Sequence, residues 1–162
     1  IEIEKENIEL LTGRFTYIFE DAAVDNSPQL LHDIDNKQVI ILTNKISNYI
    51  NRSSNKNKNT AQLTKAIRRR NVRLFKGKPT ALSPVIKKQP FKIKNLISIG
   101  LHYKDKNAVI VTNDQLTTAL ARTLGLSAIS TKNLVELTKK RQQFNNYKTK
   151  NILFYFLFLT DV

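Results

Sequence analysis

The chain has 162 residues, of which 41% are hydrophobic and 25% charged, and its formal net charge at pH 7 is +14. These values are typical of one globular domain with its own core, they exclude an intrinsically disordered chain, and the charge implies an anionic partner. The chain has no cysteine, which excludes disulfides, zinc ribbons and thiol catalysis, and its two histidines leave little for a histidine-rich metal site.

The amino-terminal half alternates short apolar strands with helical patterns. Residues 1–12 carry four glutamates and form a predicted acidic arm. The following elements are a strand at 15–19, a loop at 22–27, a helix from Ser27-Pro28 through Ile34, a buried strand at 39–42, a helix at 44–50 and a polar loop at 51–59.

The carboxyl-terminal half continues this alternation. Its predicted elements are a helix at 60–71, a strand at 72–75, an irregular basic connection at 76–90, a helix at 92–102, a strand at 108–111, a helix at 116–124 stopped by Gly125, a strand at 127–130 and a helix from Thr131 to about Gln142. The apolar run at 152–159 is too short for a membrane span, so we interpret it as a buried strand or short core helix, with a partner-docking tail as the alternative. Strands alternating with helices predict an α/β fold of three layers, with a central, mainly parallel sheet flanked by helices.

The basic residues are unevenly distributed. Between Asn36 and Lys104 there are 17 Lys or Arg and no Asp or Glu. A long tract without acids is an electrostatic surface for a polyanion, because each cation placed near a phosphate releases counterions. A merely solvated helix face is the alternative. The predicted phosphate-binding residues are Arg52, Lys56, Lys58, Lys65, Arg68, Arg69, Arg70, Arg73, Lys76, Lys78, Lys87 and Lys88.

Two acids outside this tract, Asp21 and Asp114, each follow an apolar strand. In α/β sheets such positions, beyond the carboxyl end of a strand, commonly bind ligands or metals. Each also has a simpler interpretation: Asp21 as a turn residue, and Asp114 as the N-cap of the helix that follows. Three aromatic residues in or beside the basic tract, Phe75, Phe91 and Tyr103, are predicted to lie in the core, with base stacking as the alternative.

The order of elements over residues 14–135 resembles the PIN-domain family of metal-dependent ribonucleases. The best match is residues 109–130 (VIVTNDQLTTALARTLGLSAIS), and a weaker one is residues 60–68 with the preceding strand and helix. The resemblance implies four carboxylates at the carboxyl edge of the sheet that hold one or two Mg²⁺ or Mn²⁺ ions. Asp21 and Asp114 match two of them as catalytic and metal-binding residues. Asn48 and Asn95 stand where the other two are expected, and Glu20 or Asp25 could substitute.

The sequence therefore supports three functional hypotheses. The first is an RNA-binding, non-catalytic PIN-like protein without a cofactor, acting as a structural component of a ribonucleoprotein such as a ribosome or RNA-processing complex. The second is an active Mg²⁺- or Mn²⁺-dependent endoribonuclease, and the third is a protein-interaction module without nucleic acid. The predicted domain comprises residues 13–142, and the arm at 1–12 and the tail at 143–162 would contact neighbouring subunits. No membrane association is expected, and an intracellular compartment, with an organelle as one option, fits the absence of Cys and Met.

Overall fold

The computed structural model describes residues 9–160 except 55, 78–79 and 81, and the side chains of 56 and 152–160 also lie outside the description. The chain divides into two compact units, residues 14–134 and the described residues before and after them. The elements of the first unit are β1 (Thr16–Phe19), α2 (Asp21–Asn26), α3 (Leu30–Asp33), β2 (Val39–Leu42), α4 (Ile46–Arg52), α5 (Lys56–Ile67), β3 (Val72–Leu74), α6 (Pro84–Lys87), α7 (Phe91–His102), η1 (Lys104–Lys106), β4 (Ala108–Val111), α8 (Gln115–Thr123) and β5 (Ser127–Ile129).

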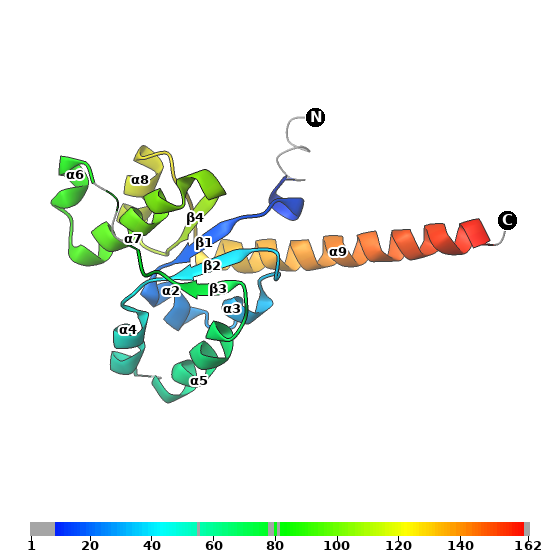
Figure 1. Ribbon diagram of the computed structural model, residues 1–162, viewed down its shortest axis with the longest axis horizontal. Coiled ribbons are helices and arrows are strands. Elements are labelled where there is room, and N and C mark those ends of the chain that lie inside the picture. Colours follow the sequence, from blue (N-terminus) through cyan, green and yellow to red (C-terminus); the bar gives the residue numbers. More distant parts are fainter. Residues whose placement is uncertain (1–8, 55, 78–79, 81, 161–162) are drawn as a thin grey trace. The chain divides into compact units, whose positions relative to one another are not determined.

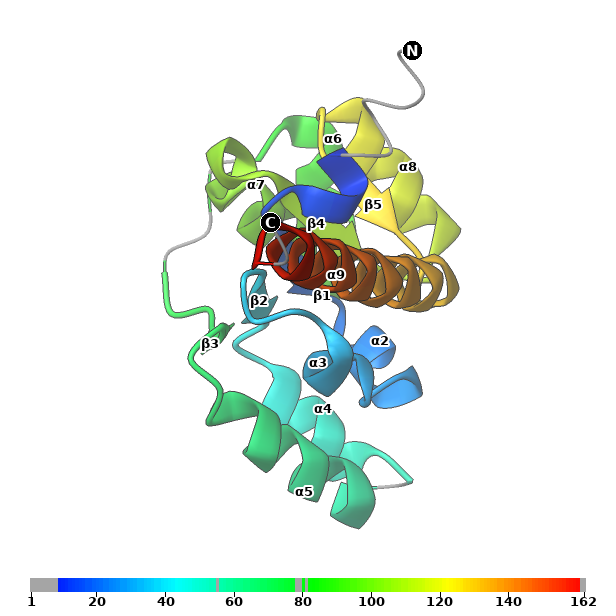
Figure 2. The same cartoon turned by 90° about the vertical axis from the view of Figure 1, so that its right-hand side faces the viewer.

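The sheet of residues 14–134 has five strands in the order β3-β2-β1-β4-β5, and all neighbouring strands are parallel. Within this unit α4 and α5 lie on one side of the strands and α7 and α8 on the other (Figures 1 and 2). The predicted three-layer α/β fold with a parallel sheet is therefore confirmed.

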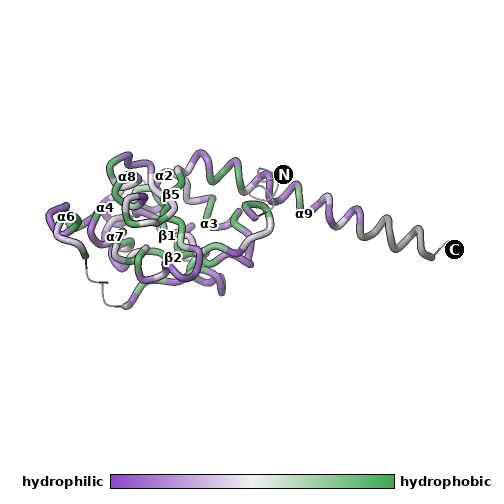
Figure 3. Tube along the Cα trace, turned by 90° about the horizontal axis from the view of Figure 1, so that it is seen from above, coloured by the Kyte–Doolittle hydropathy of each residue, from purple (hydrophilic) through white to green (hydrophobic). Residues whose placement is uncertain are grey.

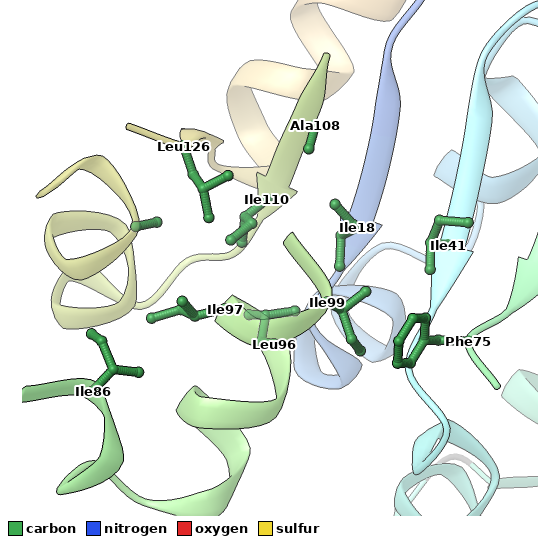
Figure 4. Close-up of a cluster of buried hydrophobic side chains, with 11 residues drawn as sticks. Ile18, Ile41, Phe75, Ile86, Leu96, Ile97, Ile99, Ala108, Ile110 and Leu126 are labelled. Carbon is green, nitrogen blue, oxygen red and sulfur yellow. The ribbon is translucent and has the colours of Figure 1, made fainter. Parts of the chain in front are cut away.

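The core follows from the alternation of side chains along each strand. Ile18, Ile41 and Ile110 point to the face covered by α7, where they pack with its buried Ile97 and Ile99 (Figure 4). The alternate strand residues, such as Phe19 and Leu42, are buried on the other face. Figure 3 shows hydrophobic residues concentrated in the strand-bearing centre of this unit, with hydrophilic residues towards its outer turns. Both faces of the sheet are thus covered, as a parallel sheet requires.

Two glycines meet specific backbone demands. At Gly100, in α7, an added Cβ would lie 2.9 Å from Cδ1 of Ile110 and 3.0 Å from Cδ1 of Leu126, so a larger residue would require these side chains to shift. Gly125 follows α8 with φ of +76°, a left-handed conformation that stops the helix. The predicted role of Gly125 is confirmed.

Several predicted loops are helical. Residues 21–26 form α2, and the polar stretch predicted as a loop at 51–59 instead contains the end of α4 and the start of α5. The reason is a polar cluster in which Asp25 accepts hydrogen bonds from Ser53, at 2.8 Å, and from the buried Asn59. Hydrophobic periodicity does not register a helix that is anchored by polar side chains.

Other element boundaries also differ from prediction. The helix predicted from Ser27-Pro28 begins at Leu30, where the main-chain amide donates to the carbonyl of Ser27 and no side chain caps the helix. The connection predicted as irregular contains the short helix α6, which has Pro84 in its first turn. The final helix, α9 (Thr131–Thr160), does not end near Gln142, and the strand alternative for residues 152–159 is wrong because their backbone is helical.

The second unit contains most of α9 and the described residues 9–13, of which 9–12 are helical. The buried side chain of Arg141 donates to the carbonyls of Leu10 and Gly13, the latter at 2.9 Å. Three of the four glutamates of the predicted acidic arm lie outside the described residues. The boundaries predicted at 12/13 and 142/143 stay predictions. In the described part of the chain, no helix is both long and apolar enough to cross a membrane.

Candidate functional site

The candidate site is the carboxyl edge of the sheet, where β1, β2 and β4 end. Because these strands are parallel and adjacent, the residues that follow them meet at one edge. Glu20 and Asp21 follow β1, Thr43 follows β2, and Thr112 and Asp114 follow β4.

Glu20 is the most buried acid at this edge, with 5% of its surface exposed. Its carboxylate accepts a hydrogen bond from the Thr112 hydroxyl and forms an ion pair with the Lys92 ammonium at 3.0 Å. The hydrogen bond to Glu20 raises the pKa of Lys92 above its usual 10.5. The ammonium group of Lys92 is therefore the ionic partner of Glu20.

Asp21 is half-buried at the start of α2. It accepts a hydrogen bond of 2.5 Å from the hydroxyl of Thr43. Burial raises the pKa of Asp21 above 3.8, and the hydrogen bond from Thr43 and the charge of Lys92 oppose this effect only in part. The predicted turn role does not apply, because Asp21 is the first residue of a helix.

Asp114 is the N-cap of α8. Its carboxylate accepts hydrogen bonds from the amide of Thr117, at 3.0 Å, and from the Thr117 hydroxyl. These two bonds lower the pKa of Asp114 below 3.8. The simpler prediction for Asp114, a helix cap, is confirmed.

A pocket of about 280 Å³ opens at this edge and brings together residues that are distant in the sequence. It contains the predicted Asp21, Asn48, Asn95 and Arg52. Its remaining lining residues are Glu20, Thr43, Lys45, Tyr49, Phe91, Lys92 and Leu96.

Two further pockets share residues with this one. A pocket of about 240 Å³ shares Glu20, Lys92 and Leu96 with it and adds Asp114. A third, of about 310 Å³, shares Phe91 and Asn95 and adds Lys87 and Lys94. We call the three together the carboxyl-edge groove. Asp114 thus lies in the groove but not in the pocket that holds Asp21.

Among solved structures the chain is similar to a PilT N-terminus (PIN) domain protein from the hyperthermophilic archaeon Sulfolobus solfataricus, with 17% sequence identity and a TM-score of 0.51 over 76% of this chain and 93% of that one. The chain has a PIN-like fold. A domain of a functionally unknown protein from Methanocaldococcus jannaschii is also similar, at 16% identity and a TM-score of 0.47 over 72% of this chain and 90% of that one. No protein-family model matches the sequence, and no curated protein does.

The acids of the PIN-like domain do not fit the metal site that the resemblance implies. Within the described residues no three acids or histidines are grouped so that they could hold a metal ion. Glu20 is paired with Lys92, and one carboxylate oxygen of Asp114 accepts both hydrogen bonds that cap α8. Asn48 and Asn95 offer neutral amides, and the amide nitrogen of Asn95 donates to Asn44 at 3.0 Å. Hard divalent cations favour sites with several carboxylates, and this site offers too few.

Asp25, which the sequence suggested as a substitute acid, has a different role. Its carboxylate joins α2 to Ser53 and Asn59, and it does not line the pocket. Of the two suggested substitutes, only Glu20 lies at the site.

The basic residues of the PIN-like domain divide between two edges of the sheet. Arg52, Lys87 and Lys94 line the carboxyl-edge groove, together with Lys45 and Lys92. Arg68, Arg69 and Arg70 precede β3 and therefore lie at the opposite, amino edge. The other predicted phosphate-binding residues, Lys58, Lys65, Arg73, Lys76 and Lys88, are exposed, and the side chains of Lys56 and Lys78 lie outside the described part of the chain.

Arg69 has a structural role. Its guanidinium donates to the carbonyls of Leu31 and Ile34, the latter at 3.0 Å, and to the side chain of Asn36. These bonds satisfy the end of α3 and hold the segment that leads into β2. Arg69 therefore stabilises the fold, and phosphate binding by the exposed Arg68 and Arg70 stays a prediction.

The three aromatic residues of the basic tract lie in different environments. Phe75 is buried and Tyr103 packs against the core, as predicted. Phe91 is 59% exposed and lines two pockets of the groove, so its predicted place in the core is wrong. Sequence reasoning also missed the pairing of Glu20 with Lys92, because the contact depends on where α7 meets the sheet.

Proposed function

We propose that the PIN-like domain binds RNA without cleaving it and serves as a structural component of a ribonucleoprotein. The observation that carries this proposal is the charge of the pocket at the carboxyl edge. Its lining has three cations, Lys45, Arg52 and Lys92, against two acids, Glu20 and Asp21. Lys92 already pairs with Glu20, and within the described residues Lys45 and Arg52 form no ion pair, so these two can attract a phosphate.

The absence of catalysis is supported by the acids themselves. A metal-dependent nuclease needs carboxylates that are free to bind the ion and to offset its charge. Here one acid is paired with a lysine, one caps a helix, and two expected acids are amides. Asp21 remains, with a pKa raised by burial, which disfavours its charged form.

The test is the affinity for a single-stranded RNA of about ten nucleotides, within the ~4–16 that a single-strand-binding domain covers. Fluorescence anisotropy over a range of salt concentrations measures it. We expect the affinity to fall steeply with salt, with a slope of about −0.7 per phosphate neutralised. A protein-interaction module whose charge serves only solubility would show no such binding.

Two triple variants with equal charge changes locate the binding surface. Replacing Lys45, Arg52 and Lys94 by Glu reverses cations in the groove, and we expect affinity to fall about 100-fold or more. Replacing Arg68, Arg70 and Arg73 by Glu reverses exposed cations outside it, and we expect a loss of only a few-fold. The opposite ranking would place the RNA at the amino edge of the sheet.

Cleavage of the same RNA in the presence of Mn²⁺ tests the catalytic alternative. We expect intact RNA after prolonged incubation with the wild-type chain. Cleavage that is lost in Asp21→Asn would contradict the non-catalytic part of the proposal and leave RNA binding in place.

A further inference from the structure

We propose that the pocket at the carboxyl edge holds one unpaired nucleotide whose base stacks on Phe91. The inference rests on the proposed RNA binding and narrows it to single strands. It also assigns a specific role to an aromatic side chain that neither the core nor the acids of the site require.

Phe91 is the first residue of α7, and 59% of its surface is exposed. An exposed ring of this size leaves apolar surface in water that folding would otherwise bury. The neighbouring Ile93 and Leu96 of the same helix pack into or against the core, so the exposure of Phe91 is not shared by the apolar residues near it. The ring instead lines the pocket that holds Lys45 and Arg52 and the one that holds Lys87 and Lys94.

The chemistry of the pocket suits a nucleotide. Tyr49 supplies a second aromatic ring to the lining, and Asn48 and Asn95 supply amides that can both donate to and accept from the edge of a base. Lys45 and Arg52 supply positive charge for a phosphate. Rings for the base, amides for its edge and cations for the backbone are the combination by which proteins bind single-stranded RNA.

The size of the pocket limits the ligand. At about 280 Å³ it lies just below the ~300–1,000 Å³ typical of small-molecule sites, so we expect it to hold no more than one nucleotide. A base in a duplex is stacked on both faces and paired at its edge, and it would have to leave the helix to enter. We therefore expect a strong preference for single strands.

The groove also suggests how the strand continues. Phe91 and Asn95 belong both to this pocket and to the third one, which adds Lys87 and Lys94. A strand with one base on Phe91 thus has cations on both sides of that base, with Lys45 and Arg52 in one pocket and Lys87 and Lys94 in the next. The phosphates before and after the stacked nucleotide would contact these two pairs.

The first measurement compares Phe91 variants in binding the single-stranded RNA. We expect Phe91→Ala and Phe91→Leu to weaken binding about 5- to 100-fold, the effect of losing one stacked base, while Phe91→Tyr keeps most of the affinity. The matched control is Val85→Ala, which alters another exposed apolar side chain, 63% exposed, that lines none of the three pockets. Thermal melts of each variant test whether it is folded.

A second measurement detects stacking directly. The chain has no tryptophan, so Phe91→Trp introduces a single tryptophan at the proposed site, and its emission can be excited selectively at wavelengths where tyrosine does not absorb. We expect its emission to be quenched by the single-stranded RNA and left nearly unchanged by an abasic ribose-phosphate oligomer of the same length. The wild-type chain should bind the abasic oligomer about as weakly as Phe91→Ala binds the normal RNA.

The outcomes separate the two proposals. If the wild type binds RNA, and neither Phe91→Ala nor the removal of the bases weakens that binding, the stacking site is overturned but the proposed function is kept. A wild-type chain that binds neither oligomer would overturn the proposed function and the stacking site with it. Equal affinity for a duplex and a single strand would also contradict the inference.

Discussion

The two edges of the parallel sheet both carry basic residues, but these residues face different surroundings. At the carboxyl edge Lys45 and Arg52 line a pocket that also contains a half-buried acid and two aromatic rings. At the amino edge the guanidinium of Arg69 donates to two main-chain carbonyls and an asparagine. One edge places positive charge around a pocket, and the other uses part of its charge to hold the fold together.

If the groove is the binding surface, as we propose, a count of cations along the sequence does not locate it. Arg68, Arg69 and Arg70 are the densest basic run between Asn36 and Lys104, yet they lie away from the groove. The cations that line the groove are scattered over residues 45–94 and are brought together by the sheet topology. Single-site substitutions can test this division of roles.

The largest effect on stability is expected for Arg69→Ala. The change removes three hydrogen bonds from a charged donor, and bonds of this kind contribute about 1.5–3 kcal/mol each when they can be isolated. Because water can reach part of the site, we expect a loss of about 3 kcal/mol in the free energy of unfolding, measured by urea denaturation. RNA affinity should stay within a few-fold of the wild type.

Arg68→Ala is the matched control, since this neighbouring side chain is exposed. We expect its stability to stay within about 0.5 kcal/mol of the wild type, as for ordinary surface positions. Equal losses of unfolding free energy in the two variants would contradict the structural role of Arg69. If Arg69→Ala loses much RNA affinity but keeps its stability, the amino edge of the sheet is part of the binding surface.

A smaller effect is expected at the carboxyl edge from the pair of Glu20 and Lys92. Lys92→Met leaves a buried carboxylate without its cation but keeps the hydrogen bond from Thr112. We expect a loss of about 1–2 kcal/mol, because the lysine is 59% exposed and the pair is partly screened by solvent. The raised pKa of Lys92 means that the ionic contribution is complete below pH 10.5 and is lost as pH rises above that value.

A double-mutant cycle isolates the interaction. Glu20→Gln and Lys92→Met, alone and together, should show a coupling energy of about 1 kcal/mol at neutral pH. Additive effects of the two substitutions would mean that the pair does not stabilise the fold. Glu20 would then keep only its hydrogen bond from Thr112 and have no stabilising ionic partner, which favours the catalytic alternative.

Most of the fold was predictable from the sequence, since short apolar blocks rich in β-branched residues, such as Val39–Leu42 and Ala108–Val111, favour buried strands. The helices missed at residues 21–26 and 51–59 lie where polar side chains anchor the backbone. Asn59 is buried because it donates to Asp25, and neither residue carries a hydrophobic signal. The site was predictable in part: strand ends locate Asp21 and Asp114, but the pairing of Glu20 with Lys92 depends on where α7 meets the sheet.

The smallest effect is expected for Asp114→Ala, which removes the cap of α8. The loss of an N-cap costs about 1 kcal/mol. Because the pKa of Asp114 is lowered in the folded state, its contribution is present above pH 3.8 and is lost as pH falls through the folded-state pKa. The difference in melting temperature between wild type and Asp114→Ala should therefore be constant near neutral pH and shrink below about pH 4.

Asp114→Asn is the matched control, because asparagine also caps helices but carries no titrating charge. Its melting temperature should lie closer to that of the wild type, and its gap from Asp114→Ala should not change with pH. RNA affinity should be equal or slightly higher in both variants, since each removes a negative charge from the groove. A marked loss of affinity in either variant would mean that Asp114 contacts the ligand, and the carboxyl edge would then use its acids as well as its cations.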